Sequence, residues 1–597
     1  MLNKFLWLWQ YYKKNLGILS ILIFLTPIQV MFQVTIPRMI DFSIDYMNEQ
    51  KLPDDFFAVF LANFGAKFSL EPALTFGLSF VILGLISSLL YFTVQSRRAK
   101  MNIKLEWMFR QVAFDKATTK GPDFYNRFRT GDLVTRMTDD VAEKLSWFAC
   151  SGIFRLYEAL LMVSFTIAMM VSIDAKMTLW AVLPLPILIV IFFVSASVLE
   201  KRYDYLQGKI SEFNDLLEAC FSGIRVVKAY VLEKSQKEKF EKTALNRRQA
   251  EIDAVKMHAI IDSMYMYIWQ FAILIVLVAG GYAVMNSSLS QGKLGSFIFY
   301  TVWLVFPMFD IGQFLVKSRQ SAVSMNRLME LENMPELVTD TNMINAPQMI
   351  SHDIIFENVS FTFPELSHQI IDNVSVTIPK GSTVAVVGKV GSGKSWFVNM
   401  IPRLVEPTGG KIKIGEHELE KYTLENLRQA IGYVPQEPVL FSDTIQNNIL
   451  MGREDISDEL LQWAIDVSQL KAEIESFPDG INTYIGTRGM SISGGQKQRL
   501  GLARALVGKP EILILDDCTS ALDSKTESAL WDHLHKVLPD LTAILITHRP
   551  DTLEKTDNIF VFENGAIIEN GHHNDLMNSE SQYAKIYKQY RLAEIVN

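Results

Sequence analysis

The sequence predicts a multi-domain membrane protein: an all-α domain with six transmembrane helices and long cytoplasmic helical arms, followed by an α/β domain of the P-loop type with a helical subdomain. Two observations support this. A mean hydropathy of +0.16 with 20% charged residues is too apolar for a soluble chain and too charged for one lying wholly in lipid. The long charge-free runs precede residue 345, and a glycine-rich motif follows it. We therefore divide the chain into a membrane domain (1–330), a linker (331–350) and a second domain (351–597).

Six apolar runs have about the 20 residues that a helix needs to cross a bilayer. The expected spans are residues 16–36, 73–94, 148–173, 177–199, 260–285 and 294–315. The first run follows Lys13 and Lys14, but it is too long for a cleaved signal and lacks a small-residue cleavage site. We therefore interpret it as a membrane span.

The distribution of basic residues predicts the orientation of these spans. Lys and Arg are concentrated between the second and third spans and between the fourth and fifth, whereas the opposite connections are short or carry few of them. By the positive-inside tendency, the basic connections and both termini are expected to be cytoplasmic, in a cell membrane. The net charge of −8 argues against a nucleic-acid partner.

The basic connections have a helical pattern of their own. Apolar residues recur at helical spacing through Leu105, Met108 and Val112, and again near Leu216 and Cys220. We expect the membrane helices to continue into the cytoplasm as arms, with small crosswise helices at 121–131 and 223–230. The alternative is that both connections are ordinary loops.

A complete G-x-x-x-x-G-K-S phosphate loop lies between a strand-like run, Thr383 to Val387, and a helix. Its backbone amides can face phosphate oxygens, its lysine can reach the β- and γ-phosphates, and its serine can bind magnesium. The loop consists of Gly388, Lys389, Val390, Gly391, Ser392, Gly393, Lys394 and Ser395.

Two further motifs follow in the second domain. The run Ile512 to Asp516 has the unbroken apolar content of a buried parallel strand and ends in a carboxylate that can hold magnesium-bound water. Before it lies a serine, two glycines and a glutamine at the start of a helix, a pattern that can bind an anion on backbone amides. These residues are Ser493, Gly494, Gly495 and Gln496.

In this order and spacing, the three motifs resemble the ATP-binding domain of ABC transporters, and the six spans resemble the exporter type of that family. The resemblance implies further roles for matching positions. Phe363 would stack on adenine, and Gln436 would bind magnesium and sense the membrane domain. Asp523 would close the D-loop, and His548 would contact the γ-phosphate.

The resemblance also implies an assembly and a reaction. Two ATP-binding domains would pair head to tail, each ATP and its Mg²⁺ lying between one phosphate loop and the partner's signature motif. One chain would then be a half-transporter, an ATP hydrolase coupled to the export of hydrophobic or amphipathic compounds. The turns at 121–131 and 223–230 match the coupling-helix positions of exporters. The alternatives are a homodimeric lipid or peptide exporter, and an ATP-gated channel or regulator on the same fold.

One position departs from the family pattern. After the Walker B aspartate, Asp516, active members carry a glutamate that polarises the attacking water, whereas this chain has Asp517. Aspartate is one methylene shorter, and a misplacement of about 1 Å can slow such a reaction about 100-fold. We predict a degenerate site, with the intact signature motif serving a different partner, as in bacterial heterodimeric multidrug exporters. The alternative is an active homodimer.

Two ionisable residues lie within predicted spans. Charge inside a membrane is costly unless it faces the protein interior or a water-filled cavity. We therefore expect Asp310 in the sixth span and Glu158 in the third to line a transport pathway. The alternative is that each lies near the cytoplasmic end of its helix and is simply solvated.

Overall fold

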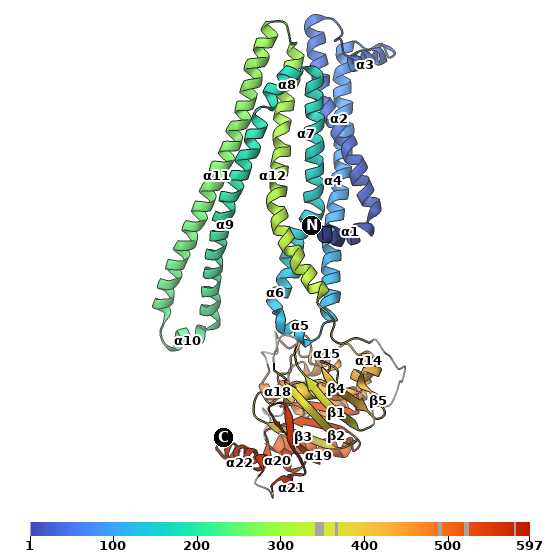
Figure 1. The fold of residues 1–597 in the computed structure, drawn as a ribbon, viewed down its shortest axis with the longest axis vertical. Helices are drawn as coiled ribbons and strands as arrows, with labels where there is room; N and C mark the ends of the chain where they lie inside the picture. The colour runs from blue at the N-terminus through green and yellow to red at the C-terminus, as the bar shows by residue number, and fades with distance from the viewer. Residues whose placement is uncertain are drawn as a thin grey trace. The chain divides into compact units, whose positions relative to one another are not determined.

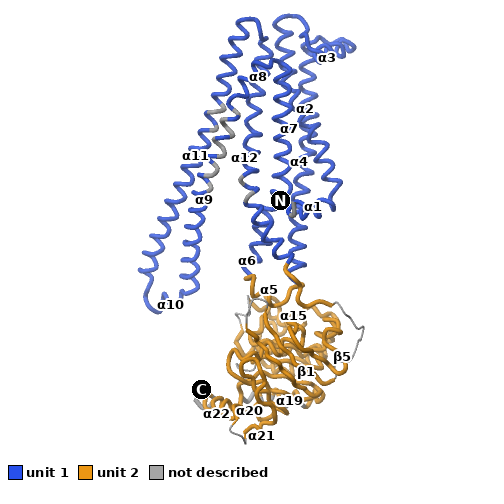
Figure 2. Tube along the Cα trace, viewed as in Figure 1, with its two compact units in different colours: residues 1–118, 130–333 blue, residues 119–129, 334–597 orange. Residues whose placement is uncertain are grey.

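The computed structural model describes residues 2–340, 352–363, 368–486, 492–518, 524–577 and 581–596. The chain forms two compact units: unit 1 comprises residues 1–118 and 130–333, and unit 2 comprises residues 119–129 and 334–597 (Figure 2). Residues 119–129, which the sequence assigns to the membrane domain, therefore group with the second unit. The expected linker at 331–350 begins inside the last helix of unit 1, and its residues 341–350 lie outside the described part of the chain.

Unit 1 consists of helices joined by short connections (Figure 1). They are α1 (Leu2–Lys13), α2 (Leu16–Glu49), α3 (Phe56–Ala66), α4 (Pro72–Thr118), α6 (Thr130–Thr135), the π-helical segment η1 (Arg136–Gly152), α7 (Ile153–Ile173), α8 (Ala175–Val182), α9 (Pro184–Ser222), α10 (Ile224–Ala229), α11 (Glu233–Met285) and α12 (Gln291–Asn333).

Four continuous helical stretches among the described residues are long and apolar enough to cross a membrane: α2, α4, the stretch from α6 through α7, and α12. Along α4, many apolar side chains are exposed, as expected of a surface in contact with lipid. They include Leu78, Ile82, Leu85, Leu89 and Phe92, which share one face at helical spacing. The spans expected at 177–199 and 260–285 fall in α8–α9 and α11 and stay predictions. The first of these is interrupted before Pro184, whose nitrogen cannot donate a helical hydrogen bond.

Several helices continue well past the expected spans. At 1.5 Å per residue, the 47 residues of α4 extend about 70 Å, more than twice the thickness of a bilayer core. Figure 1 shows α9 and α11 side by side, connected by α10 at one end. Short helices occupy both predicted turns: α5 (Pro122–Arg127), which belongs to unit 2, and α10.

Unit 2 contains two sheets, and the prediction of an α/β domain is confirmed. An antiparallel sheet has the order β2-β1-β4-β5, and a six-stranded sheet has the order β10-β9-β3-β8-β7-β6. The strands are β1 (Ile354–Phe361), β2 (Ile371–Ile378), β3 (Thr383–Gly388), β4 (Gly409–Ile414), β5 (His417–Glu418), β6 (Ile431–Val434), β7 (Ile512–Asp516), β8 (Thr542–Ile546), β9 (Asn558–Glu563) and β10 (Ala566–Gly571). Within the larger sheet β6, β7, β8, β3 and β9 run parallel, and β10 is antiparallel.

The helices of unit 2 lie around these sheets (Figure 1). Beside α5 they are α13 (Lys394–Asn399), α14 (Leu424–Gln429), α15 (Ile445–Leu450), α16 (Asp458–Val467), α17 (Lys471–Ser476), α18 (Gly494–Leu506), α19 (Ser524–Val537), α20 (Pro550–Glu554), α21 (His573–Met577) and α22 (Gln582–Val596), with 3₁₀ turns η2 (Leu419–Lys421) and η3 (Gly480–Asn482). A buried apolar cluster joins α15, α16 and α18 to the larger sheet.

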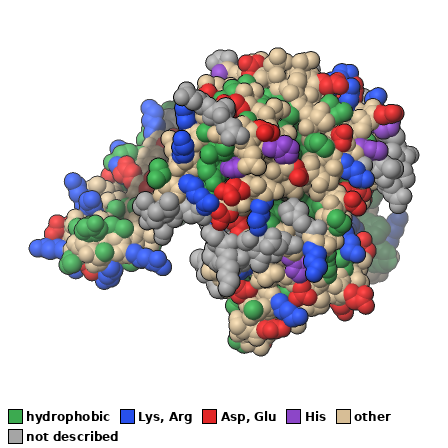
Figure 3. All heavy atoms as spheres, turned by 90° about the horizontal axis from the view of Figure 1, so that it is seen from below, with side chains coloured by type: hydrophobic (Ala, Val, Ile, Leu, Met, Phe, Trp, Pro, Cys, Tyr) green, Lys and Arg blue, Asp and Glu red, His purple; other side chains and the backbone are tan. Residues whose placement is uncertain are grey.

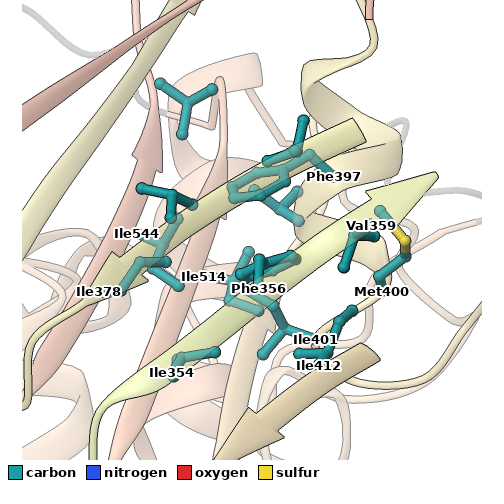
Figure 4. Packing of buried hydrophobic residues seen from close by; sticks show 14 of the residues in the cluster. Ile354, Phe356, Val359, Ile378, Phe397, Met400, Ile401, Ile412, Ile514 and Ile544 are labelled. Atoms are coloured by element: carbon teal, nitrogen blue, oxygen red, sulfur yellow. The ribbon is translucent and has the colours of Figure 1, made fainter. Parts of the chain in front are cut away.

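A buried apolar core holds the two sheets together (Figure 4). Phe356 on β1 stacks on Phe397 of α13, with ring centroids 4.5 Å apart. Phe397 also contacts Phe562 on β9, at a centroid distance of 5.1 Å. Because α13 begins at Lys394, this packing fixes the helix that carries the end of the phosphate loop.

Candidate active site and membrane cavity

Four parallel strands end at one edge of the larger sheet, and the predicted site residues follow them. The phosphate loop begins at the end of β3, and Asp516 and Asp517 lie at the end of β7. Gln436 follows β6, and His548 follows β8. Ligands of open α/β sheets bind outside the carboxyl ends of the strands. The fold therefore brings these widely separated residues to a place where a ligand can bind.

Two glycines of the phosphate loop are required by the space around them. Gly388 has φ +148°, and a Cβ there would lie 2.3 Å from the carbonyl oxygen of Phe562. Gly393 has φ +102°, and its Cβ would lie 2.7 Å from the carbonyl oxygen of Ile370. A side chain at either position would be strained and would clash with backbone. Glycine therefore permits the tight path from β3 into α13.

The remaining donors of the loop fit a phosphate group. Lys394 Nζ donates to the carbonyl oxygens of Gly388 at 2.8 Å and Lys389 at 2.9 Å, which leaves a third N–H for a ligand. Burial lowers the pKa of Lys394, and the charges of Asp516 and Asp517 oppose that shift. Among the described residues, the buried Ser392 hydroxyl has no hydrogen-bond partner. Phosphate oxygens would supply acceptors for both groups.

The end of β7 carries groups that suit magnesium. Burial raises the pKa of Asp516, and a hydrogen bond with Ser395 lowers it. Ser395, Asp516 and Gln436 offer a hydroxyl, a carboxylate and an amide oxygen, the hard oxygen ligands that Mg²⁺ accepts together with waters and phosphate oxygens. The described residues contain no cluster of three or more His, Cys, Asp or Glu side chains able to hold a metal. A magnesium ion here would therefore depend on the nucleotide for some of its ligands.

Asp517 sits in a left-handed backbone conformation, with φ +46°, which aspartate tolerates better than most residues. Its N–H donates to the carbonyl oxygen of Ile546 at 2.9 Å. Its carboxylate Oδ2 accepts from Gln436 Nε2 at 3.4 Å and lies 4.0 Å from His548 Nε2. Burial raises the pKa of Asp517, and His548 and then Gln436 oppose the shift. The structure thus brings Asp517, Gln436 and His548 together.

His548 is also held from its other side. Its Nδ1 lies 2.8 Å from the hydroxyl oxygen of Tyr590 on α22, and the two rings meet edge to face with centroids 5.0 Å apart. Tyr590 is 42 residues away in the chain and is absent from every motif named above. The terminal helix therefore contributes a side chain to the site that the motifs do not predict.

The aromatic residue expected to stack on adenine is partly buried. Phe363 meets Phe361 edge to face at a centroid distance of 4.9 Å, and Trp396 at 4.8 Å. It packs at the border of the apolar core, and its stacking on a base stays a prediction. Asp523 lies outside the described residues.

The signature residues begin helix α18 and face outward. Ser493 is exposed, and its hydroxyl accepts from the N–H of Gln496 at 3.3 Å. The Gln496 side chain accepts in return from the N–H of Ser493 at 2.9 Å, which completes a capping box. Gly494 is exposed and Gly495 is half-buried. This helix start is thus ordered by its own residues and remains accessible to a ligand.

Unit 1 contains a cavity of about 420 Å³ lined by α2, α4, α7 and α12, the same helices that can cross a membrane. Both predicted pathway residues, Glu158 and Asp310, line it. The complete lining is Val30, Gln33, Tyr91, Gln95, Arg98, Arg155, Glu158, Ala159, Met162, Trp303, Phe306, Pro307 and Asp310.

The acids of this cavity are paired with arginines. Glu158 Oε2 lies 2.9 Å from Arg98 Nη1, and Asp310 Oδ1 lies 3.4 Å from Arg155 Nη1. Arg98 also contacts Gln95. Each pair joins two different helices. Because the lining carries two arginines and two acids, the charges on the cavity wall balance.

Sequence reasoning missed Arg98 and Arg155 as cavity residues and Tyr590 as a site residue. Arg155 stands inside the expected span 148–173, and an arginine within a span was a usable signal. Arg98 is one of the basic residues between the second and third expected spans, which were used only to predict orientation. No pattern in the sequence indicates that Tyr590 meets His548.

Comparisons with known proteins agree with this architecture. Residues 18–308 match the ABC transporter transmembrane region, and residues 371–520 match the ABC transporter family. A similar protein of Bacillus subtilis (strain 168), YheI, is described as a probable multidrug resistance ABC transporter ATP-binding/permease protein. It is 32% identical over 86% of this chain and 88% of its own length.

Two further comparisons cover nearly the whole chain. MdlA of Escherichia coli (strain K12), described as a multidrug resistance-like ATP-binding protein, is 27% identical over 97% of this chain and 95% of its own length. The structure of a bacterial Atm1-family ABC exporter with ATP bound superposes with a TM-score of 0.74. It covers 97% of this chain and 99% of that chain at 22% identity, so the overall fold is shared.

Proposed function

Because this chain belongs to the ABC transporter family, as a half-transporter of the exporter type that couples ATP hydrolysis to transport, we propose that it is one half of a heterodimeric exporter. It exports hydrophobic or amphipathic compounds from the cytoplasm or inner leaflet of the cell membrane, with both termini cytoplasmic. The observation that carries the heterodimer is Asp517, which stands where a catalytic glutamate is expected.

Exposed apolar side chains support the presence of a second half-transporter. The end of the α9–α10–α11 hairpin exposes a group of apolar side chains, and among the residues of α10 only Val227 is buried. The exposed apolar residues are Phe221, Ile224, Val226, Tyr230 and Val231. Figure 3 shows this end of the hairpin, at the left, as an apolar patch bordered by Lys and Arg side chains. A partner's surface would cover it, as it would cover the exposed start of α18.

The Walker side of this chain binds nucleotide and turns it over slowly. Lys394 and the Ser392 hydroxyl bind phosphate, and Ser395, Asp516 and Gln436 hold Mg²⁺, which neutralises phosphate charge when bound. The carboxylate of Asp517 accepts from Gln436 at 3.4 Å and stays beside His548. One methylene shorter than glutamate, it falls short of the position from which a base accepts a proton from water.

The signature residues of this chain serve the second ATP site, the one on the partner's phosphate loop. Ser493, Gly494 and Gly495 begin a 13-residue helix whose free N–H groups suit a γ-phosphate held on the partner's phosphate loop. The partner supplies a glutamate there, so turnover takes place mainly at that second site.

The cavity of unit 1 supports an amphipathic substrate. Trp303, Phe306 and Met162 give it an apolar wall, and Arg155 and Asp310 give it a solvated ion pair. Such a mixture of apolar surface and a few charged groups suits compounds that carry both properties.

The deciding experiment compares variants of Asp517 in the transporter purified from its host membrane through a tag on this chain. Asp517→Ala is expected to lower ATPase activity by less than about twofold, and alanine at the partner's glutamate is expected to lower it at least about 100-fold. Asp517→Glu is expected to raise hydrolysis at this site. The matched control is Glu475→Ala, which removes an exposed carboxylate on α17.

Mass spectrometry of the same preparation identifies the second chain. A stable homodimer with strong ATPase activity that Asp517→Ala abolishes would refute the heterodimer, and would support the homodimeric exporter instead.

A further inference from the structure

The terminal helix α22 packs back onto the sheet that carries the nucleotide site. Its residues Tyr583, Ile586 and Tyr587 form a buried cluster with side chains of β3, β9 and α20, and Tyr590 packs against the same cluster. Arg591 pairs with Asp551 at 2.8 Å. Figure 1 shows α22 next to α20, which begins two residues after His548, so α22 is held close to the loop of that residue.

The hydroxyl of Tyr590 meets the imidazole of His548. Its oxygen is 2.8 Å from His548 Nδ1. Burial, followed by the charge of Asp517, raises the pKa of Tyr590 to about 12. The phenol is therefore neutral at physiological pH and has one proton to donate.

The carboxylate on the other side of the imidazole favours one direction for this hydrogen bond. Asp517 Oδ2 lies 4.0 Å from His548 Nε2. A carboxylate favours a proton on the nitrogen that faces it, so the neutral imidazole carries its proton on Nε2 and accepts from the phenol at Nδ1.

We propose that Tyr590 is a positioning residue for His548: its hydroxyl holds the imidazole in the Nε2–H tautomer, so that a hydrogen-bond donor faces Asp517 and the nucleotide. The histidine and α22 are thereby linked through one hydroxyl. The inference rests on the proposed role of His548, and it adds the residue that orients this side chain.

The same helix provides a matched control. The hydroxyl of Tyr587 contacts Glu554 on α20 and takes no part in the contacts of His548. Tyr590→Phe and Tyr587→Phe each remove one hydroxyl and keep the ring that packs on the sheet. A difference between the two variants therefore reports the His548 contact rather than the docking of α22.

The direct test is the reactivity of His548 toward diethyl pyrocarbonate in the nucleotide-free transporter, followed by mass spectrometry of the peptide. The reagent acylates the nitrogen that bears the lone pair, which in the proposed tautomer is Nδ1, covered by the Tyr590 hydroxyl. Tyr590→Phe is expected to raise the rate at His548 about fivefold, the effect of losing one ordinary hydrogen bond, and Tyr587→Phe to leave it unchanged. An unchanged rate in Tyr590→Phe, or an equal rise in both variants, would overturn the proposal.

A double-mutant cycle gives a second, functional readout. In Asp517→Glu transporter, Tyr590→Phe is expected to lower kcat about fivefold with the KM for ATP within about twofold, and to have no further effect once His548 is alanine. Equal effects of Tyr590→Phe with and without His548 would assign it a purely structural role. Failure of Asp517→Glu to raise activity would instead count against the proposed degenerate site, and would leave the reactivity result to decide the tautomer.

Discussion

Charged side chains gather at two places in the molecule: the edge of the larger sheet that carries the phosphate loop, Asp516 and Asp517 (the nucleotide edge), and the cavity of unit 1. The two places balance these charges differently. At the nucleotide edge, burial raises the pKa values of Asp516 and Asp517, and Lys394 is the amine that acts on both. In the cavity each acid has its own arginine, Arg98 for Glu158 and Arg155 for Asp310.

The nucleotide edge therefore needs cations from its ligand, whereas the cavity wall does not. Buried carboxylates without enough cations are costly, and Mg²⁺ with its nucleotide would remove that cost. Paired charges inside a membrane cost less and leave the cavity neutral as a whole. The nucleotide edge therefore suits a ligand that brings a cation, whereas the acids of the cavity already have theirs.

The largest expected effect comes from removing the amine of the nucleotide edge. Lys394→Ala leaves the phosphate without its buried cation, so ATP-driven transport of a labelled compound into proteoliposomes should fall at least about 100-fold. Lys411→Ala, an exposed lysine paired with Glu418, is the control. Transport that persists in Lys394→Ala would contradict the assignment, and flux only down a gradient in the unmodified protein would identify a channel.

The next effect tests the buried pair of the cavity. Arg98 and Glu158 are 7% and 21% exposed, whereas Arg155 and Asp310 are 44% and 36% exposed. Arg98→Ala leaves Glu158 unpaired and should destabilise the protein by about 3 kcal/mol. Arg155→Ala should cost less than about 1 kcal/mol. Thermal unfolding in detergent measures both, and equal shifts would show that burial does not distinguish the pairs.

A smaller effect tests the unbalanced carboxylates. Burial raises the folded-state pKa of Asp516 above the ordinary value of 3.8, so the folded protein binds more protons between the two values. This contribution to stability is present at low pH and is lost as pH rises through the raised pKa. Asp516→Asn should therefore raise the Tm of the nucleotide-free protein at pH 7 by a few degrees and abolish the further rise with Mg²⁺ and ATP.

The control for this prediction is Glu475→Gln, which should leave Tm unchanged because that carboxylate is exposed. A lower Tm of Asp516→Asn without nucleotide would show that the ionised carboxylate stabilises the domain.

The smallest expected effect concerns selectivity. Asp310→Asn leaves Arg155 without its carboxylate and gives the cavity wall a net positive charge. Transport of cationic compounds should fall about threefold relative to neutral ones of the same size, as expected for one exposed charge pair. Basal ATPase activity should stay the same. An unchanged transport profile across cationic, neutral and anionic compounds would show that Asp310 takes no part in selection.

The sequence predicted the nucleotide edge better than the cavity, for a physical reason. Each part of the edge is a short segment: a loop of eight residues, a strand ending in Asp516, a helix start at Ser493. Strand order then places these segments together, because the carboxyl ends of parallel strands meet at one edge. The helix lengths of unit 1 were less predictable, since hydropathy detects the part of a helix in lipid and not its polar continuation.

What the sequence determined by itself was the local chemistry: a phosphate loop whose glycines permit its path, a serine-glycine-glycine-glutamine helix start, apolar helices, and two successive aspartates after a buried strand. The tertiary structure decided which side chains meet. Arg155 and Asp310 are 155 residues apart, and Tyr590 and His548 are 42 apart. Neither pair has a local pattern, because contacts between separate helices, or between a helix and a loop, depend on how the elements pack. The pairing that balances the cavity and the hydroxyl that orients His548 are therefore products of the fold.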